Sequence, residues 1–284
     1  MKVGVIGAGR LGGCLATYLS RAGLLEAITA SSEEKSARLA EQFGTKAADN
    51  LGVLVRSDVI LLAVPDGRIH EVAEDLAARV RSAEGKTVLH TSGAARLDVL
   101  ASLNAKGAHV GSLHPLQSFA GGVVNLKGVY MALDGDALAR KVAEELVKVF
   151  CGRPFFVPEK ERAAYHAAAC ICSNYAVAVE ALAEQLMSRW TGSRKAAWQA
   201  LLPLFEGTAA NLRKVSEPGQ ALTGPIARGD SGTVARHLEV LPDELKPAYC
   251  SLGLAAAQLA LTNGTIDAAK ARQLTGLLKM QEGL

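Results

Sequence analysis

Gly7-Ala8-Gly9-Arg10-Leu11-Gly12 is the stretch that decides the fold of this 284-residue chain. Residues 2–6 come directly before it and predict a short buried strand, and residues 13–19 follow with the apolar spacing of a helix. A strand, a Gly-x-Gly-x-x-Gly turn and a helix in this order are typical of a dinucleotide site. The first glycine permits the tight turn, the second lets the backbone approach a pyrophosphate, and the third lets the helix pack on the strand. We therefore expect a nicotinamide cofactor at Gly7, Ala8, Gly9, Arg10, Leu11 and Gly12, the alternative being a glycine-rich turn without a ligand.

The composition indicates a globular protein with a large core. The chain is 49% hydrophobic and only 5% aromatic, and its net charge of +3 is too small to argue for nucleic acid or a membrane surface as a partner. Its five cysteines are scattered, and its histidines show no metal-ligand spacing, so we expect thiols and no metal. The first strand begins at residue 2, which leaves no room for a signal peptide and favours a cytoplasmic location.

The end of the second predicted strand, residues 27–30, bears on the choice of cofactor. NAD enzymes usually carry an acidic residue there for the ribose 2′-hydroxyl, whereas this chain has Ser31 and Ser32. Hydroxyls tolerate a 2′-phosphate, so NADP is favoured over NAD, although Glu33 and Glu34 keep NAD as the alternative. Ser31 with Glu34 also reads as a helix capping box. Three cations are placed to pair with a 2′-phosphate: Arg10, Lys35 and Arg38.

Further apolar runs predict the rest of a doubly wound α/β sheet of the Rossmann type. They are residues 44–47, 58–64, 86–90, 108–113, 128–133 and 154–157. Loops at the carboxyl ends of parallel strands line the cofactor crevice of such a sheet. Val64 and Pro65 are therefore predicted cofactor contacts, and Ser92 and His114 are predicted to lie at the same edge.

From Pro158 onward only helices are predicted, at residues 159–190, 193–215, 230–240, 243–262 and 265–280. We therefore expect a dinucleotide-binding domain over residues 1–157 and an all-helical substrate and dimerisation domain over residues 158–284.

Residues 163–179 contain no charged side chain and have a length at the lower edge of a membrane span. The run is alanine-rich and carries His166, Ser173 and Asn174, which are costly in lipid, so we expect a helix buried between protein layers and no membrane. The helical domain is small for that task, which favours a homodimer. On an ideal helix His166 and Ser173 point within about 20° of each other and form a polar stripe. This stripe either lines a site or consists of core residues whose hydrogen bonds are satisfied within the protein.

Several motifs together resemble one family. They are residues 7–12, 62–66, 113–119, 169–175 and 222–230. The pattern is similar to bacterial Rossmann-like proteins whose C-terminal half is a domain of unknown function. The resemblance covers essentially the whole chain and implies NADP-dependent oxidoreductase activity with no settled substrate.

The architecture also resembles, more distantly, 6-phosphogluconate dehydrogenase, pyrroline-5-carboxylate reductase and prephenate dehydrogenase. Ser92 and His114 match the catalytic serine and histidine of prephenate dehydrogenases, and Asn174 matches an asparagine on the long helix of the β-hydroxyacid dehydrogenases. The lysine those enzymes carry one turn earlier falls near Cys170 here. The resemblance therefore does not extend to lysine-based β-hydroxyacid chemistry.

These observations predict hydride transfer to or from a small carbonyl, imine or hydroxy-acid substrate, an anionic one included. His114 is the first candidate for the acid, base or polarising donor, and His166 is the second. Ser92 and Asn174 are expected to hydrogen-bond the substrate, and Arg228 is expected to pair with a substrate carboxylate, from the same chain or a second subunit. Alternatively, His114 is a core or capping residue, Arg228 belongs to a structural turn, and the protein is a non-catalytic NADP(H)-binding sensor or scaffold.

Overall fold

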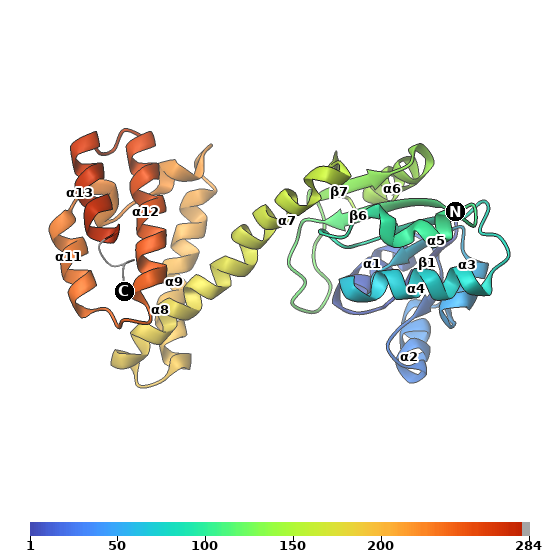
Figure 1. Ribbon diagram of the computed structural model, residues 1–284. Coiled ribbons are helices and arrows are strands. Elements are labelled where there is room, and N and C mark those ends of the chain that lie inside the picture. Colours follow the sequence, from blue (N-terminus) through green and yellow to red (C-terminus); the bar gives the residue numbers. More distant parts are fainter. Residues whose placement is uncertain (280–284) are drawn as a thin grey trace. The chain divides into compact units, whose positions relative to one another are not determined.

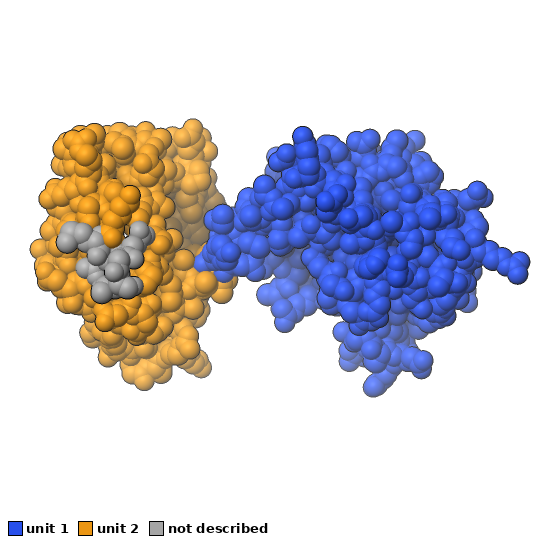
Figure 2. All heavy atoms as spheres, in the orientation of Figure 1, with its two compact units in different colours: residues 1–175 blue, residues 176–284 orange. Residues whose placement is uncertain are grey.

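The computed structural model describes residues 1–279 and divides into two compact units, Met1–Tyr175 and Ala176–Leu284 (Figures 1 and 2). The last residue of the helix predicted at 265–280, and the last five of the predicted helical domain, lie outside the described residues.

The first unit is built on one eight-stranded sheet with the order β3-β2-β1-β4-β5-β6-β7-β8. Every neighbouring pair is parallel except β6 with β7. The fold class predicted from the sequence is therefore confirmed. The strands are β1 Val3–Ile6, β2 Leu25–Thr29, β3 Lys46–Ala47, β4 Val59–Leu62, β5 Thr87–His90, β6 His109–Pro115, β7 Tyr130–Gly135 and β8 Arg153–Phe156.

Helices cover both faces of this sheet (Figure 1) and bury two apolar layers. Leu15 and Leu146 belong to the layer under α1, α2 and α6, and Leu54 and Leu76 belong to the layer under α3, α4 and α5. The helices are α1 Arg10–Arg21, α2 Glu33–Phe43, α3 Asn50–Arg56, α4 Asp66–Arg79, α5 Ala101–Asn104 and α6 Ala137–Val149. The sequence pattern did not predict α5 or the short 3-10 turn η1 Leu97–Leu100 before it.

A long helical run, Glu159–Thr191, follows the sheet. It comprises the 3-10 turn η2 Glu159–Glu161, α7 Arg162–Cys170, the π-turn η3 Ile171–Tyr175 and α8 Ala176–Thr191. The contact division falls inside this run, beyond the boundary predicted near Pro158, because side chains of α7 bond to the ends of β5 and β6.

By length and composition alone, this run is long and apolar enough to cross a membrane. None of its most apolar window is buried inside the described chain, so the expected burial between protein layers is wrong for a single chain.

The second unit contains only helices among its described residues, 176–279. After α8 come α9 Arg194–Leu212, the 3-10 turn η4 Pro218–Ala221, α10 Pro225–Arg228, α11 Ser231–Val240, α12 Lys246–Thr262 and α13 Ala268–Lys279. Val234, Leu238 and Leu274 form the centre of its core, which α11, α12 and α13 enclose. By contrast, α8 has no buried residue and α9 only Ala197, although these two helices pack against each other.

Candidate functional site

The glycine turn between β1 and α1 has the shape that a bound dinucleotide requires. Gly7 adopts φ +94°, and a Cβ there would lie 2.8 Å from the carbonyl oxygen of Ala63. A Cβ on Gly12 would collide with the backbone oxygen of Gly7, whereas Gly9 has open space on its Cβ side. The first glycine thus makes the turn, the third allows close packing, and the second leaves room for a ligand.

The N-terminus of α1 is equally suited to an anion. Gly9 is the N-cap, no side chain caps the helix, and its first turn holds no acidic residue. The amides of that first turn therefore have no intrahelical acceptor, and the helix dipole favours negative charge there. The residues present fit the pyrophosphate of a dinucleotide, because no acidic side chain of the first turn repels its negative charge.

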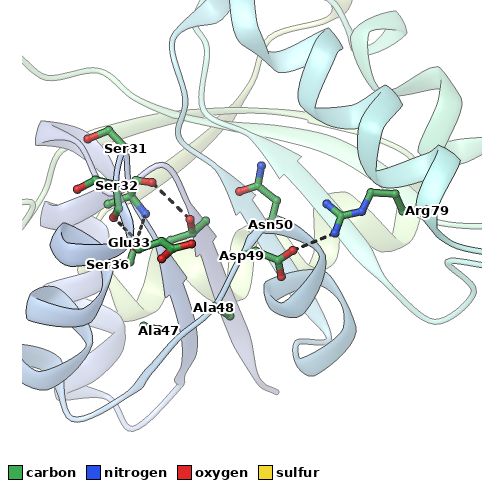
Figure 3. Close-up of a pocket in the computed structure, with 11 residues that line it drawn as sticks. Ser31, Ser32, Glu33, Ser36, Ala47, Ala48, Asp49, Asn50 and Arg79 are labelled. Carbon is green, nitrogen blue, oxygen red and sulfur yellow. Dashed lines mark hydrogen bonds and ion pairs between the residues drawn. The ribbon is translucent and has the colours of Figure 1, made fainter.

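A cleft of about 500 Å³ lies beyond the end of β2 (Figure 3). Ser31 is exposed at its rim and makes no hydrogen bond within residues 1–279. Ser32 caps α2 by accepting a hydrogen bond from the amide of Lys35 at 3.2 Å, so the cap is Ser32 and not Ser31. The cleft is lined by Thr29, Ala30, Ser31, Ser32, Glu33, Ser36, Ala47, Ala48, Asp49, Asn50 and Arg79.

The charges in this cleft differ from those expected. Its lining cation is Arg79, whose guanidinium lies 3.0 Å from Asp49 (Figure 3) and 3.2 Å from Asp75. The sequence pattern did not reveal Arg79, because it ends a helix remote in sequence from β2. The three predicted cations do not line the cleft, and their side chains make no ion pair in the described part of the chain: Arg10, Lys35 and Arg38.

Val64 and Pro65 follow β4, as predicted. Val64 packs beside Gly7, where a Cβ would meet its Cγ1 at 2.8 Å, and Pro65 is the N-cap of α4. Val64 therefore borders the same turn as the glycines, and the expected contact of Pro65 with the cofactor stays a prediction.

Ser92 follows β5 and is buried. Its hydroxyl donates to Oδ2 of Asp66 at 2.6 Å and accepts from the amides of Ala94 and Ala95 at 3.2 and 2.9 Å. Because a hydroxyl offers one donor and two acceptor positions, all of its capacity is filled. This geometry suits a residue that shapes the loop better than one that holds a substrate.

His114 ends β6 and meets the long helix. Its Nδ1 lies 2.6 Å from the hydroxyl of Tyr165, which is the one hydrogen bond of the ring within residues 1–279. The rings of His114 and His166 are 6.3 Å apart, with Gly93 against both: a Cβ on Gly93 would lie 2.7 Å from Nδ1 of His166 and 2.9 Å from Cε1 of His114. Tyr165 and Gly93 were not expected at the site, because no sequence motif marks them and only their contacts with His114 and His166 reveal them.

Burial determines the protonation of this pair. It lowers the pKa of His114 to about 4, with further contributions from the nearby His166 and Arg162, and it raises the pKa of Tyr165 to about 12. At neutral pH the imidazole is therefore neutral and the phenol is protonated. The Tyr165 hydroxyl then donates to Nδ1 of His114, which leaves the histidine proton on Nε2.

Arg162, at the start of α7, is completely buried. Its guanidinium donates to Oγ of Ser112 and to the backbone oxygen of Ser92, both at 2.7 Å. These bonds join the long helix to β6 and to the loop after β5. Burial lowers the pKa of Arg162, and burial together with the positive charge of Arg162 lowers the pKa of the neighbouring His90 to about 3.

The predicted stripe on the long helix is split in two. His166 faces Gly93, and its Nε2 lies 3.5 Å from Sγ of Cys170, while its buried Nδ1 has no partner within residues 1–279. Ser173 and Asn174 instead line a different cleft, together with Tyr165. They lie in the π-turn η3, which changes the angle per residue and so breaks the ideal spacing.

Arg228 ends α10 in the second unit and is exposed. Its expected pairing with a substrate stays a prediction. No group of three or more His, Cys, Asp or Glu side chains within residues 1–279 is arranged to hold a metal ion.

Two family profiles match the sequence. The profile of a Rossmann-like domain matches residues 1–115, and that of a domain of unknown function, DUF2520, matches residues 129–256. No curated protein sequence matches the chain. A Rossmann-like match followed by a match to this domain of unknown function confirms the resemblance drawn from the motifs.

Solved structures share this architecture along almost the whole chain. A Bacteroides fragilis protein, provisionally named an NADP oxidoreductase, has a TM-score of 0.70 at 22% identity, covering 97% of this chain and 98% of its own. A reductive aminase from Aspergillus terreus, solved with NADPH and ethyl levulinate, has a TM-score of 0.60 at 18% identity, and the match covers 99% of this chain and 94% of that chain. A pyrroline-5-carboxylate reductase from Coxiella burnetii has a TM-score of 0.57 at 14% identity, and the match covers 99% of this chain and 97% of that chain. At these identities the likeness establishes the fold.

Proposed function

We propose that this protein is an NADP(H)-dependent oxidoreductase that transfers a hydride between the nicotinamide and a small carbonyl, imine or hydroxy compound. The observation that carries the proposal is the His114–Tyr165 pair, 2.6 Å apart at the carboxyl end of β6 in a sheet whose β1 leads into a dinucleotide turn. The names of the similar structures, which include an NADP oxidoreductase and a reductive aminase with NADPH, support it.

Different residues are proposed to hold different parts of the cofactor. The turn at Gly7, Gly9 and Gly12 and the open amides of α1 would hold the pyrophosphate, and Ser31 would contact the ribose of the adenosine. The bound nicotinamide supplies or accepts the hydride.

The protein contributes polarisation and a proton path. Tyr165 fixes the orientation of His114 through Nδ1, so that Nε2–H can donate to the substrate oxygen or nitrogen where negative charge develops. A neutral imidazole suits this task, because it donates one directed hydrogen bond without a full charge. Arg162 and Gly93 set the distance between the long helix and the loop after β5.

The serines at the end of β2 favour NADP over NAD. We expect NADPH to bind more tightly than NADH in a fluorescence titration. Ser31→Asp places a carboxylate where a 2′-phosphate would lie, so it should weaken the binding of NADPH by about tenfold or more and leave the binding of NADH unchanged. Ser31→Asn is the matched neutral control. If the two substitutions change the affinities for NADPH and NADH equally, Ser31 does not lie at the 2′-phosphate of the cofactor.

A homodimer is part of the proposal. Large apolar side chains are exposed on α8 and α9, among them Val177 at 70%, Trp190 at 72% and Leu204 at 70%. Proteins in water rarely leave many large apolar side chains of neighbouring helices exposed. Light scattering of the purified protein should give twice the chain mass, and Trp190→Glu with Leu204→Glu should give a monomer. A monomeric wild type, or one recovered only with membranes, would contradict this proposal.

The proposed activity is tested on purified His114→Asn and His166→Asn proteins. Wild type should bind NADPH and oxidise it with at least one member of a panel of ketones, 2-oxo acids and imines. His114→Asn should bind NADPH normally and lose about 100-fold or more in turnover. Normal turnover in both variants would refute the site. NADPH binding by wild type without turnover on any substrate would favour a sensor or scaffold instead.

A further inference from the structure

A second cleft adjoins the His114–Tyr165 pair within the first unit. It has a volume of about 490 Å³ and lies between the loop after β6 and one side of the long helix. Tyr165, which is bonded to His114, forms part of its wall. The cleft is lined by Leu116, Gln117, Ser118, Phe119, Tyr165, Ala168, Ala169, Cys172, Ser173 and Asn174.

None of these ten side chains is formally charged at neutral pH. The cleft beyond β2 differs in this respect, since Glu33, Asp49 and Arg79 all line it. A carboxylate substrate loses hydration when it binds, and proteins compensate with an arginine or lysine. The walls of the cleft beside Tyr165 provide neither.

Two basic groups close to Tyr165, Arg162 and His114, are withheld from a substrate. Arg162 is completely buried, and both of its terminal nitrogens already donate to protein oxygens, one on Ser112 and one on Ser92. His114 is neutral at physiological pH, because burial lowers its pKa to about 4. Asp66, bonded to Ser92, adds a negative charge that repels a carboxylate.

The remaining surface suits an uncharged organic group. Leu116, Phe119, Ala168 and Ala169 offer apolar contact, while Asn174 and Gln117 offer neutral hydrogen bonds. A small apolar body in such a cleft is stabilised by burial and oriented by a few polar groups.

We propose that the substrate is an uncharged ketone, aldehyde or imine with an apolar body, and that 2-oxo acids and hydroxy acids are excluded. This inference rests on the proposed function and narrows it, since the sequence alone left an anionic substrate open. It also replaces the expectation that Arg228 pairs with a substrate carboxylate. In the reducing direction the carbonyl or imine carbon gains a hydride from NADPH. The π-bond electrons move to the oxygen or nitrogen, and that atom takes the proton on Nε2 of His114. The Tyr165 hydroxyl gives its proton to Nδ1 in the same step, so the imidazole stays neutral. NADP⁺ is left, and one proton from solvent then restores the His114–Tyr165 pair.

The test compares substrates that differ only in charge. NADPH oxidation is measured with 2-oxo-4-phenylbutanoate and with its ethyl ester. We expect kcat/KM for the ester to exceed that for the acid by about 50-fold or more, because the acid buries an unpaired charge. A binding measurement without turnover accompanies it: in the presence of NADPH, benzamide should raise the melting temperature, and benzoate should not.

A cation placed in the cleft provides the matched variant. Ser118→Arg should raise kcat/KM for the 2-oxo acid by about tenfold or more, whereas the equally long but neutral Ser118→Gln should not. Rescue of the acid by arginine alone would identify missing charge as the cause of its exclusion.

The outcomes separate this inference from the function on which it rests. A wild type that prefers the acid, or that binds benzoate over benzamide, overturns the inference and leaves an NADP-dependent oxidoreductase in place. NADPH binding without oxidation by either substrate class overturns both.

Discussion

The hydroxyl of Tyr165 lies 2.6 Å from Nδ1 of His114, so the long helix and the end of β6 meet at one hydrogen bond. Tyr165 itself rests edge-on against Phe155 of β8, with ring centroids 5.8 Å apart. The histidine is thus held by a tyrosine that the sheet also supports. This arrangement therefore fixes the orientation of the His114 ring as well as its position.

Tyr165→Phe should therefore lower kcat by about tenfold or more and leave the Kd for NADPH unchanged, because the ring stays and only the hydrogen bond is lost. Steady-state kinetics with a neutral ketone and a parallel NADPH titration measure both quantities. Tyr175→Phe is a suitable control, since Tyr175 is exposed and does not line the cleft. Equal kcat for Tyr165→Phe and wild type would show that the hydrogen bond does not assist turnover.

Gly93→Ala should lower turnover by about 100-fold, because the new methyl group must push His114 and His166 from their positions. Its Cβ would lie only 2.7 Å from Nδ1 of His166. The matched control is Gly207→Ala in α9, where a Cβ meets no atom within 4 Å. Full activity of Gly93→Ala would mean that the two rings tolerate a shift and need no fixed spacing.

Stability should fall as the solution becomes acidic. The pKa of His90 is lowered to about 3 and that of His114 to about 4, so between pH 6.5 and those values the unfolded chain binds protons that the folded chain does not. In that window the free energy of unfolding decreases by about 1.4 kcal/mol per pH unit for each histidine, and above pH 6.5 the contribution is complete.

His90→Leu should remove one of these two contributions. Both ring nitrogens of His90 are buried without partners within residues 1–279, so an apolar side chain there should also stabilise the protein at neutral pH. Urea denaturation at a series of pH values gives the slope. A slope identical to that of wild type would contradict the assignment of His90 as a buried neutral imidazole.

Arg162→Met should destabilise the protein by about 3 kcal/mol, because it removes two buried hydrogen bonds that anchor α7 and leaves their acceptors unpaired. The same substitution should raise the pKa of His114, since the Arg162 charge helps to keep it low. Chemical denaturation and NMR titration of His114 measure the two effects. Arg162→Lys keeps the charge and should leave the pKa of His114 near its wild-type value. A pKa equally raised in both variants would argue for a purely structural effect.

The sheet could be predicted because its signals are local. Continuous apolar runs such as residues 59–62 mark central parallel strands, and the motif marks the two glycines of the turn between β1 and α1, Gly7 and Gly12, that have no room for a Cβ. For the same reason His114 and Ser92 were expected at the strand ends, where the structure places them.

The rest of the site depends on contacts between distant segments. Arg162 reads in the sequence as a polar residue at a helix start, yet it is buried because Ser112 and Ser92 approach it from the sheet. The π-turn at Ile171–Tyr175 breaks the ideal helical spacing, so Asn174 joins Tyr165 in the uncharged cleft while His166 faces Gly93. Periodicity could not show either relationship.

The measurement that most directly tests the central claim is single-turnover oxidation of NADPH by the wild type and by His114→Asn, each mixed with an uncharged ketone. The loss of nicotinamide absorbance reports the hydride step itself, and a titration of each protein reports cofactor binding. The account predicts that both proteins bind NADPH equally and that the variant transfers the hydride about 100-fold or more slowly. Equal rates in the two proteins would contradict it.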